Sequence, residues 1–414
     1  MENIVVQKYG GTSVGSIEKI RRVADKIIEV QKTGARLVVV VSAMGGETDR
    51  LISLARDMSE NPDSREYDSI FATGEQVSCA LLAMCLKDRG YDAQSYLGFQ
   101  IGIKTCATFS RARIQSIDSQ KIFTELDKGK IVIIAGCQGA DAEGNITTFG
   151  RGGSDLSAVA IAAALEANSC EIYTDVIGVF TADPRICSNA RKIEKISYEE
   201  MMEMASLGAK VLERRSVACA MNHHVRLYVR SSFESVQGTL VCEEDPTMEN
   251  ILVSAITHDK KESRIIVKDI PAQTSAIARL FSEIAHHEIV VDMIVQNMAD
   301  SSGKALLSFT VPKDDSRSAV KIVEKLYPEA HVSCDHNIAK ISIIGAGMRT
   351  HAGVAAKMFE TLASENIDIK MISTSEIKVS CVIDEKYTEL AVRLLHESFN
   401  LGQKNLKEDL GVTE

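Results

Sequence analysis

The stretch Ile4–Gly15 (IVVQKYGGTSVG) decides the fold of this chain. Its first residues, 4–8, are mostly apolar and β-branched, which predicts a buried strand. From Ser16 onward, apolar residues recur with the spacing of an amphipathic helix. A strand, a glycine-rich turn and a helix N-terminus favour an anion site, because backbone N–H groups converge there and the helix dipole attracts negative charge.

Lys8 precedes the glycines, where its ammonium group would reach a bound phosphate. The alternative is a tight Gly-Gly turn that binds nothing. A Walker A loop is excluded, because Ser16-Ile17 follows the glycines where that motif has Lys-Ser or Lys-Thr. The spacing is not that of a G-x-G-x-x-G dinucleotide loop either.

Composition limits the class of protein. The 414 residues predict two or three domains, and the net charge of −10 argues against nucleic-acid binding. A secretion signal is not expected, and the apolar runs are too short for a membrane span. Ten cysteines without C-x-x-C spacing indicate reduced thiols in a cytoplasmic protein. The adjacent histidines at 223–224 and 286–287 diverge in direction, so we do not expect them to bind metal.

The first 245 residues alternate between apolar runs and helical patterns. Strands are expected at 37–41, 131–135, 171–173 and 225–229, and helices at 51–58, 68–88, 156–167 and 198–214. All-apolar strands fit a parallel sheet covered on both faces. Polar loops follow several of these strands, which favours an α/β enzyme with a nucleotide site over a binding module.

A second polar loop, Arg151–Asp155 (RGGSD), precedes an alanine-rich helix. Ser154 is expected as the N-cap and Asp155 in the first turn, and the plain alternative is that both residues only cap the helix. Arg151 favours a functional role, because a guanidinium and free backbone N–H groups at a helix N-terminus can bind one carboxylate together.

Four segments together resemble the amino acid kinase family, and within it the aspartate kinases: Lys8–Val14, Arg151–Asp155, Thr174–Val176 and Ala182–Arg185. The resemblance covers nearly the whole chain. It implies a three-layer α/β sandwich with a mainly parallel sheet over residues 1–245. The implied reaction transfers the γ-phosphoryl group of ATP, with Mg²⁺, to the β-carboxylate of L-aspartate. The product, 4-phospho-L-aspartate, begins lysine, threonine and methionine biosynthesis.

The resemblance also implies roles for individual residues. Lys8 and Asp155 are the expected catalytic residues, with Asp155 organising the lysine. The expected ATP-binding residues are Lys8, Gly10, Gly11, Thr174, Asp175, Phe180, Asp183, Pro184, Arg185 and Lys210. The expected aspartate-binding residues are Ser42, Thr48, Glu75, Arg151, Gly152, Gly153 and Ser154, with Arg151 at the α-carboxylate and Glu75 at the ammonium group.

These residue types suit the chemistry. The attacking carboxylate is already an anion, so catalysis needs positioning and neutralisation of phosphate charge more than a strong base. No set of protein side chains with metal-ligand spacing is expected. The sequence departs from the family pattern at Leu156-Ser157, where Thr-Thr is usual, and at Ile177, where Asp is usual.

The C-terminal third contains an internal repeat. Ile265-Ile266, Phe281 and Met293 recur as Ile343-Ile344, Phe359 and Met371, at an offset of 78 residues (371 − 293). Each repeat predicts a strand, a helix and two strands, with helices at 274–286 and 354–365. Gly345-Ala346-Gly347 is not interpreted as a dinucleotide loop, because the third glycine is misplaced.

The repeats resemble ACT domains, βαββαβ modules that bind amino acids, here expected at 246–335 and 336–414. In this family they imply feedback inhibition by lysine, threonine or both. The alternative for the second module is a purely structural role. The sequence departs from the family pattern at Ala272, where Gly is usual after the proline, and at Ala352, where Pro is common. The expected effector residues are Asp269, Ala272, Thr274, Ala276, Asp292, Gln296, Asp368, Ile369, Ser375 and Glu376.

ACT sites are often shared between chains, so a homo-oligomer is expected. An internal start at Met248 would add a shorter regulatory chain. Two other functions compete with the kinase: a non-catalytic amino-acid sensor, and a kinase for another acceptor. A sensor would have lost a catalytic residue, yet Lys8 and Asp155 are both present. Arg151 and Glu75 favour an α-amino acid as the acceptor.

Overall fold

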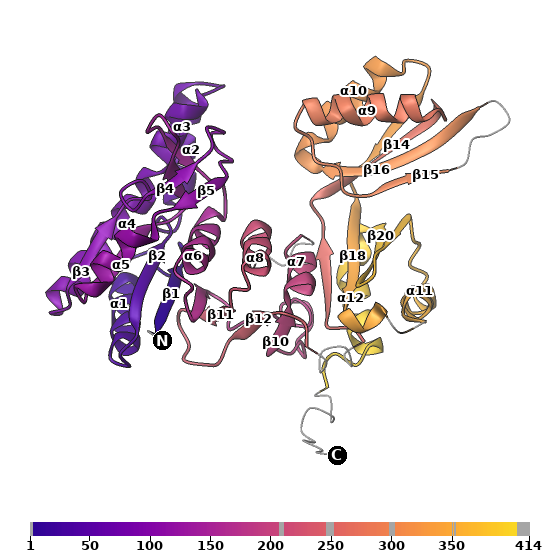
Figure 1. Cartoon of the computed structure of the whole chain (residues 1–414). Coiled ribbons are helices and arrows are strands. Elements are labelled where there is room, and N and C mark those ends of the chain that lie inside the picture. The colour runs from indigo at the N-terminus through magenta and orange to yellow at the C-terminus, as the bar shows by residue number, and fades with distance from the viewer. Residues whose placement is uncertain are drawn as a thin grey trace. The chain divides into compact units, whose positions relative to one another are not determined.

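The computed structural model describes residues 3–206, 211–245, 252–297, 303–349, 351 and 353–403 (Figure 1). The contacts divide the described chain into two compact units. The first holds residues up to Val179, residues 192–206 and residues 211–245. The second holds Phe180–Arg191 and everything from residue 252 onward. The chain therefore enters the second unit twice.

An eight-stranded sheet forms the middle layer of the first unit, in the order β10-β12-β11-β9-β1-β2-β6-β3. Neighbouring strands are parallel except β11 and β12, which are antiparallel. The expected mainly parallel sheet is confirmed. The strands are β1 (Ile4–Tyr9), β2 (Arg36–Val41), β3 (Ala93–Tyr96), β6 (Ile131–Ala135), β9 (Ser169–Thr174), β10 (Lys195–Ser197), β11 (Leu227–Ser231) and β12 (Thr239–Cys242).

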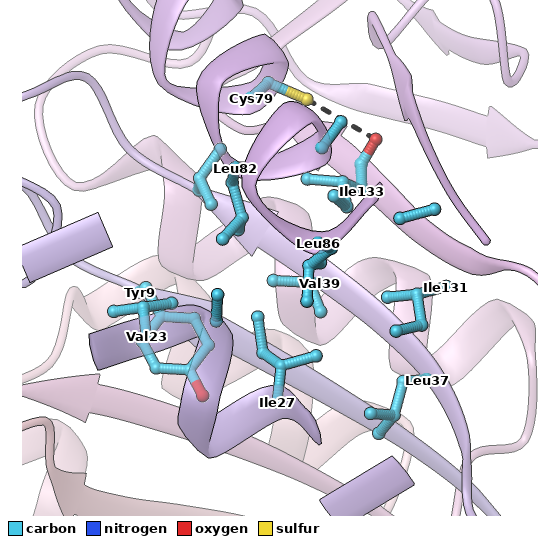
Figure 2. Packing of buried hydrophobic residues seen from close by; sticks show 14 of the residues in the cluster. Tyr9, Val23, Ile27, Leu37, Val39, Cys79, Leu82, Leu86, Ile131 and Ile133 are labelled. Atoms are coloured by element: carbon cyan, nitrogen blue, oxygen red, sulfur yellow. Dashed lines mark hydrogen bonds between the residues drawn. The ribbon is translucent and has the colours of Figure 1, made fainter. Parts of the chain in front are cut away.

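Alternating side chains of the central strands build a core on each face of this sheet. Leu37 and Val39 pack with residues of helices α1 (Ile17–Gln31) and α4 (Thr73–Asp88), as Figure 2 shows. Val38 and Val40 are also fully buried and point to the opposite face. There α6 (Gly153–Ala164) contacts β1, β2 and β9, which completes the three layers.

The remaining helices and a small sheet surround these layers. The sheet has the order β5-β4-β7-β8, and its strand β8 ends just before the turn that carries Arg151. The elements are α2 (Glu47–Met58), α3 (Ser64–Phe71), β4 (Ile103–Thr105), β5 (Ile114–Ile117), α5 (Ser119–Asp127), β7 (Gln138–Ala140), β8 (Ile146–Thr148), α7 (Tyr198–Ser206) and α8 (Arg214–Asn222).

Three local predictions were wrong. The helix expected at 68–88 is two helices, α3 and α4, that meet at Ala72, whose carbonyl accepts a hydrogen bond from Gln138 Nε2 (3.0 Å). The helix expected at 198–214 is not continuous: α7 covers Tyr198–Ser206, residues 211–213 are not helical, and α8 begins at Arg214. Gly152, at φ 77°, and not Ser154, is the N-cap of α6, because the chain turns there through a left-handed conformation that glycine adopts without strain.

The stretch Ser64–Asp88 is the one part of the described chain that is long and apolar enough to cross a bilayer by length and composition. Half of its most apolar window is buried inside the protein. Residues of α4 such as Leu82 and Leu86 are fully buried against the sheet. The stretch therefore serves as a core helix pair.

The second unit contains both repeats as α+β modules, each with a four-stranded sheet. The first has the sheet order β15-β16-β14-β17, with α9 and α10 in contact with each other over it. Its elements are β14 (Glu262–Pro271), α9 (Thr274–His286), β15 (Ile294–Gln296), β16 (Lys304–Pro312), the 3-10 turn η1 (Lys313–Asp315), α10 (Ser316–Leu326) and β17 (His331–Asp335).

The second module has the sheet order β13-β18-β20-β19. Its strand β13 precedes the first module in the chain and pairs antiparallel with β18, although it lies in the range expected for the first module. The first module is thus inserted within the second. The elements are β13 (Ala255–Asp259), β18 (Ile338–Ile344), η2 (Ala346–Arg349), α11 (Val354–Ser364), β19 (Met371–Thr374), β20 (Lys378–Asp384), η3 (Glu385–Tyr387) and α12 (Thr388–Ser398).

Candidate active site

The glycine loop after β1 lies against the loop after β2 with backbone touching backbone. A Cβ atom on Gly11 would lie 2.9 Å from the Ala43 carbonyl oxygen, so only glycine fits there. The Gly10 N–H donates to the Tyr173 carbonyl (3.2 Å) and extends the pairing of β1 with β9. Since the Gly10 amide is engaged in this way, a bound phosphate would depend mainly on Gly11.

Lys8 and Asp155 meet at the carboxyl end of β1. Lys8 Nζ lies 2.6 Å from Asp155 Oδ1, and both side chains are largely buried. Asp155 is in the first turn of α6, where the helix dipole favours its negative charge. Its Oδ2 accepts a hydrogen bond from the Glu213 backbone N–H (3.3 Å). The pair holds an ammonium group beside the glycine loop.

Glu213 is a neighbour of this pair that the sequence did not reveal. Its carboxylate caps α8 by accepting the Ser216 N–H (2.9 Å), and burial raises its pKa. A Cβ on Gly152 would lie 2.7 Å from Glu213 Cγ, so the turn before α6 also requires glycine. The only available signal was an acidic residue immediately before a helical pattern.

Glu75 is a buried carboxylate in the first turn of α4, with 3% of its surface exposed. Burial raises its pKa to about 7. Hydrogen bonds from the backbone N–H groups of Glu75 and Ala43, and the charge of Lys8, lower the pKa but do not offset the burial. Its Oε2 has no hydrogen-bond partner among the described residues. A buried unpaired carboxylate oxygen suits a cationic ligand group such as an ammonium.

Ser42 and Thr48 lie on the loop and helix that face the glycine loop. The Ser42 N–H donates to the Tyr9 carbonyl (3.0 Å), and its carbonyl accepts from Ser78 Oγ (2.7 Å). Thr48 is in the first turn of α2, after the left-handed N-cap Gly46. Backbone bonds therefore fix the position of Ser42 at this end of the sheet.

Arg151 is exposed and lies at the rim of a cavity of about 590 Å³. Its Nη2 donates to Asp49 Oδ1 (2.7 Å). Arg113 and Arg215 line the same cavity together with Glu213. Arg111 also lines the cavity, so four guanidinium groups stand against one carboxylate, which favours an anionic ligand group here.

The turn that carries Arg151 is braced by two residues that the sequence did not reveal. The buried Asp68 carboxylate accepts the N–H and hydroxyl groups of Ser110 and of Thr148, four bonds of 2.7–3.1 Å. Arg215 donates from Nη1 to the Phe149 carbonyl (3.0 Å) and from Nη2 to the Ala112 carbonyl (2.8 Å). These contacts could not be predicted from local sequence, because their partners are distant in the chain.

The residues expected to bind ATP are divided between the two units. Thr174 and Asp175 end β9 in the first unit, with Thr174 Oγ1 donating to Asp175 Oδ1 (3.1 Å). Phe180, Asp183, Pro184 and Arg185 belong to the second unit. There Arg185 donates to Asp183 from Nε (3.0 Å) and Nη2 (2.6 Å), which lowers the Asp183 pKa. Lys210 lies outside the described residues.

The effector residues expected in the first module lie on two segments of the chain. Asp269 sits at a β-bulge of β14 with φ 65°, before the Ala272–Ala276 segment that begins α9. Asp292 precedes β15, which ends at Gln296, and forms an ion pair with the buried Lys340 of the second module. The structure therefore places an acidic group of this candidate site in contact with a buried cation.

The effector residues expected in the second module lie around β19. Ile369 is partly buried in the core and Asp368 precedes it, after α11. The Ser375 N–H donates to the Lys378 carbonyl (2.8 Å), and Glu376 pairs with Arg349 (3.6 Å). Thr350 and Ala352, in the loop between η2 and α11, lie outside the described residues. Within the described chain, no group of three or more His, Cys, Asp or Glu side chains is arranged to hold a metal ion.

Comparison with known proteins agrees with this architecture. The profile of the amino acid kinase family matches residues 3–231, and that of an ACT domain matches 341–399. An aspartate kinase of Pseudomonas fluorescens is 50% identical over 404 residues, which cover 96% of this chain and 98% of that protein.

Two solved structures of Escherichia coli aspartokinase III are also similar, each covering 96% of this chain and 99% of that one. The complex with aspartate and ADP, in the R-state, has a TM-score of 0.80 at 27% identity. The complex with lysine and aspartate, in the T-state, has a TM-score of 0.75 at 26% identity.

The fold and the family match define a phosphotransferase, and the chain belongs to the amino acid kinase family. Within that family it is an aspartate kinase, an enzyme that uses ATP to phosphorylate L-aspartate. This excludes the non-catalytic sensor considered from the sequence. ACT modules make it an enzyme of the allosterically regulated kind.

Proposed function

We propose that Lys8 and Asp155 are the catalytic residues, and that lysine, threonine or both inhibit the enzyme through the ACT modules. The observation that supports the catalytic assignment is the Lys8–Asp155 ion pair (2.6 Å) beside the glycine loop. Glu75 is close enough to Lys8 for the lysine charge to act on its pKa. A fixed ammonium and a buried free carboxylate are thus held at the same end of the sheet.

The reaction needs two substrates held in line. Glu75 accepts the ammonium group of L-aspartate, and Arg151 leaves Asp49 to grip its α-carboxylate, while Ser42, Thr48 and the Gly152–Ser154 turn line the pocket. The β-carboxylate oxygen then attacks the γ-phosphorus of ATP. The new O–P bond forms as the bond to the bridging oxygen breaks, and ADP leaves with that electron pair.

Lys8 neutralises charge on the transferring phosphoryl group. Asp155 holds the Lys8 ammonium in place, so little reorganisation is needed in the transition state. The Gly11 amide, and the Gly10 amide if its bond to Tyr173 opens, donate to the same group. Thr174, Asp175, Lys210 and the Phe180–Arg185 segment hold the nucleotide.

Magnesium fits this site as an ion carried by the nucleotide. Mg²⁺ commonly takes one or two protein carboxylates and completes its shell with phosphates and water. Asp155, which pairs with Lys8, would supply such a carboxylate, and the described chain has no group of three or more metal-ligating side chains. When bound, Mg²⁺ neutralises charge on the β- and γ-phosphates.

The regulatory proposal rests on the paired ACT modules and their acidic residues. Asp292 and Gln296 in the first module, and Asp368 and Glu376 in the second, offer acceptors for an amino-acid ammonium group. The related E. coli enzyme was solved with lysine. Feedback by lysine or threonine would place the enzyme at the start of the synthesis of those amino acids. We expect a cytoplasmic homo-oligomer.

A hydroxylamine assay tests the proposal. The acyl phosphate formed from ATP, Mg²⁺ and L-aspartate is trapped as a hydroxamate, with and without lysine and threonine. We expect hydroxamate formation that falls when an effector is added. Formation that neither amino acid changes, alone or together, would contradict the regulatory part. Full activity of Lys8→Ala would contradict the catalytic part.

A further inference from the structure

The Phe180–Arg191 segment belongs to the kinase sequence but to the second unit of the structure. It is a hairpin closed by the Thr181 N–H, which donates to the Arg191 carbonyl (2.9 Å). At its base, in the first unit, the Ile193 N–H donates to the Val179 carbonyl (2.8 Å). The chain passes from the first unit into the second at this base, and the tip of the hairpin contains the proposed nucleotide residues Asp183–Arg185.

The hairpin is part of the core of the second ACT module. Ala182 and Cys187 are buried in the same cluster as β18, β20, α11 and α12, and Ile186 and Ala190 pack against it. The Ile256 N–H of β13 donates to the Thr181 carbonyl (2.8 Å). The described core of the first module includes none of the hairpin residues. The second module, and not the first, therefore supports the nucleotide segment.

His396 makes the central polar contact of this arrangement. It lies on α12 with 1% of its surface exposed, and its Nε2 is 3.0 Å from Thr181 Oγ1. Thr181 Oγ1 also accepts the Arg191 N–H (3.0 Å), and Arg191 Nε donates to the Leu401 carbonyl (2.9 Å). A buried hydroxyl or imidazole left without its partner loses more than an exposed one, so this contact favours a single position of the hairpin.

We propose that His396 is a positioning residue for ATP binding, acting through Thr181 to hold the Phe180–Arg185 segment on the second ACT module. This inference rests on the proposed nucleotide role of that segment. It gives the second module a task in the phosphotransfer reaction. Any ligand that shifts α12 or β18 would then change the affinity for ATP, and ATP would change the affinity for that ligand by the same factor.

The test uses steady-state kinetics of the full-length enzyme. Loss of the contact in His396→Leu or Thr181→Val should raise the KM for ATP about fivefold or more, while the KM for aspartate stays within about twofold. His396→Gln and Thr181→Ser keep a polar group in place and should restore most of the affinity. The double variant His396→Leu/Thr181→Val should have a KM for ATP no higher than that of the more impaired single variant.

A matched control separates positioning from general destabilisation. Ser342 Oγ and Ser380 Oγ form a buried hydrogen bond (2.6 Å) between β18 and β20 of the same module. Ser342→Ala should lower the Tm about as much as Thr181→Val, with an unchanged KM for ATP. A rise in the KM for ATP in this control equal to that of Thr181→Val would overturn the proposal.

Arg185→Ala distinguishes the two levels of inference, because the Arg185 side chain is 88% exposed and its removal leaves the hairpin core intact. If Arg185→Ala raises the KM for ATP but folded His396→Leu and Thr181→Val do not, the positioning role is wrong and the nucleotide role stands. If all three leave it unchanged, both are wrong. If only His396→Leu and Thr181→Val raise it, the positioning role stands, and Arg185 is not among the nucleotide contacts.

Discussion

Lys8 Nζ lies 2.6 Å from Asp155 Oδ1, so an ion pair joins the end of β1 to the first turn of α6. The contact brings together the loop at Gly10-Gly11 and the turn at Gly152-Gly153. It also explains why the lysine precedes its glycines: the parallel pairing of β1 with β2 and β9 fixes the backbone of Lys8, and the carboxylate fixes its ammonium group.

Replacement of either partner should abolish turnover without unfolding the enzyme. We expect Lys8→Ala and Asp155→Ala each to lower kcat by about 10³-fold or more, because an organised charge at the transferring group is lost. Asp155→Asn should be nearly as inactive. Near-ultraviolet circular dichroism and Tm should resemble the wild type. The exposed Lys32→Ala is the control; near-normal kcat in either site variant would refute the assignment.

The activity should depend on pH through Glu75. Its pKa is about 7, and only its ionised form accepts the ammonium group of aspartate. We therefore expect kcat/KM for aspartate to rise about tenfold per pH unit below 7 and to level off above it. Glu75→Gln should have low kcat/KM without this inflection. A wild-type profile that is flat between pH 5.5 and 8 would contradict the role of Glu75.

The same group should reduce stability at high pH. The folded pKa of Glu75, about 7, exceeds the ordinary value of 4.5, so the folded state binds the proton more tightly and stability falls as pH rises from 4.5 to 7. The full cost, present above pH 7, is on the order of 3 kcal/mol. Denaturant unfolding should show Glu75→Gln stabilised relative to wild type at pH 8 and much less so at pH 5. Equal differences at both values would be inconsistent with this linkage.

Arg151 should matter for substrate and not for stability. Its side chain is 72% exposed and its ion pair with Asp49 is on the surface, so Arg151→Ala should change the free energy of unfolding by no more than about 0.5 kcal/mol. The KM for aspartate should rise at least tenfold, since one partner of a charge pair with the α-carboxylate is lost. The KM for aspartate of Arg151→Lys should lie between those of the wild type and Arg151→Ala, because lysine keeps the charge but lacks the planar guanidinium. Asp49→Ala is the control and should leave this KM near normal.

Lys340 should hold the two ACT modules together. It is buried on β18 and pairs with Glu262 (2.7 Å) and with Asp292 of the first module. Burial alone would lower its pKa, but these carboxylates raise it. Lys340→Met should destabilise the second unit by about 3 kcal/mol, because the largely buried Glu262 carboxylate loses its cation. The double variant Lys340→Met/Glu262→Gln should recover part of this loss, while exposed Lys321→Met should have little effect. Additive losses in the double variant would disprove the coupling.

Much of the fold was predictable because its signals are local. The β-branched runs at 37–41 and 131–135 became β2 and β6, and the repeat offset predicted the strand-helix-strand-strand unit of each module. The errors occurred where tertiary contacts override local pattern. Ser154 has a good N-cap side chain, yet Gly152 takes that position because the turn needs a left-handed backbone that passes close to Glu213. The pairing of β13 with β18 depends on partners about 85 residues apart.

The sequence by itself determined the motifs, their order and the family they resemble, because glycine loops and apolar periodicity depend only on residues that are close together in the chain. Only the tertiary structure decided which distant groups meet. Asp68 braces the Arg151 turn, Glu213 joins Asp155, and His396 holds Thr181 from the far end of the chain. Hydrogen bonds and ion pairs form between groups a few ångströms apart, and that proximity arises when the strands pair and the helices pack around a shared core.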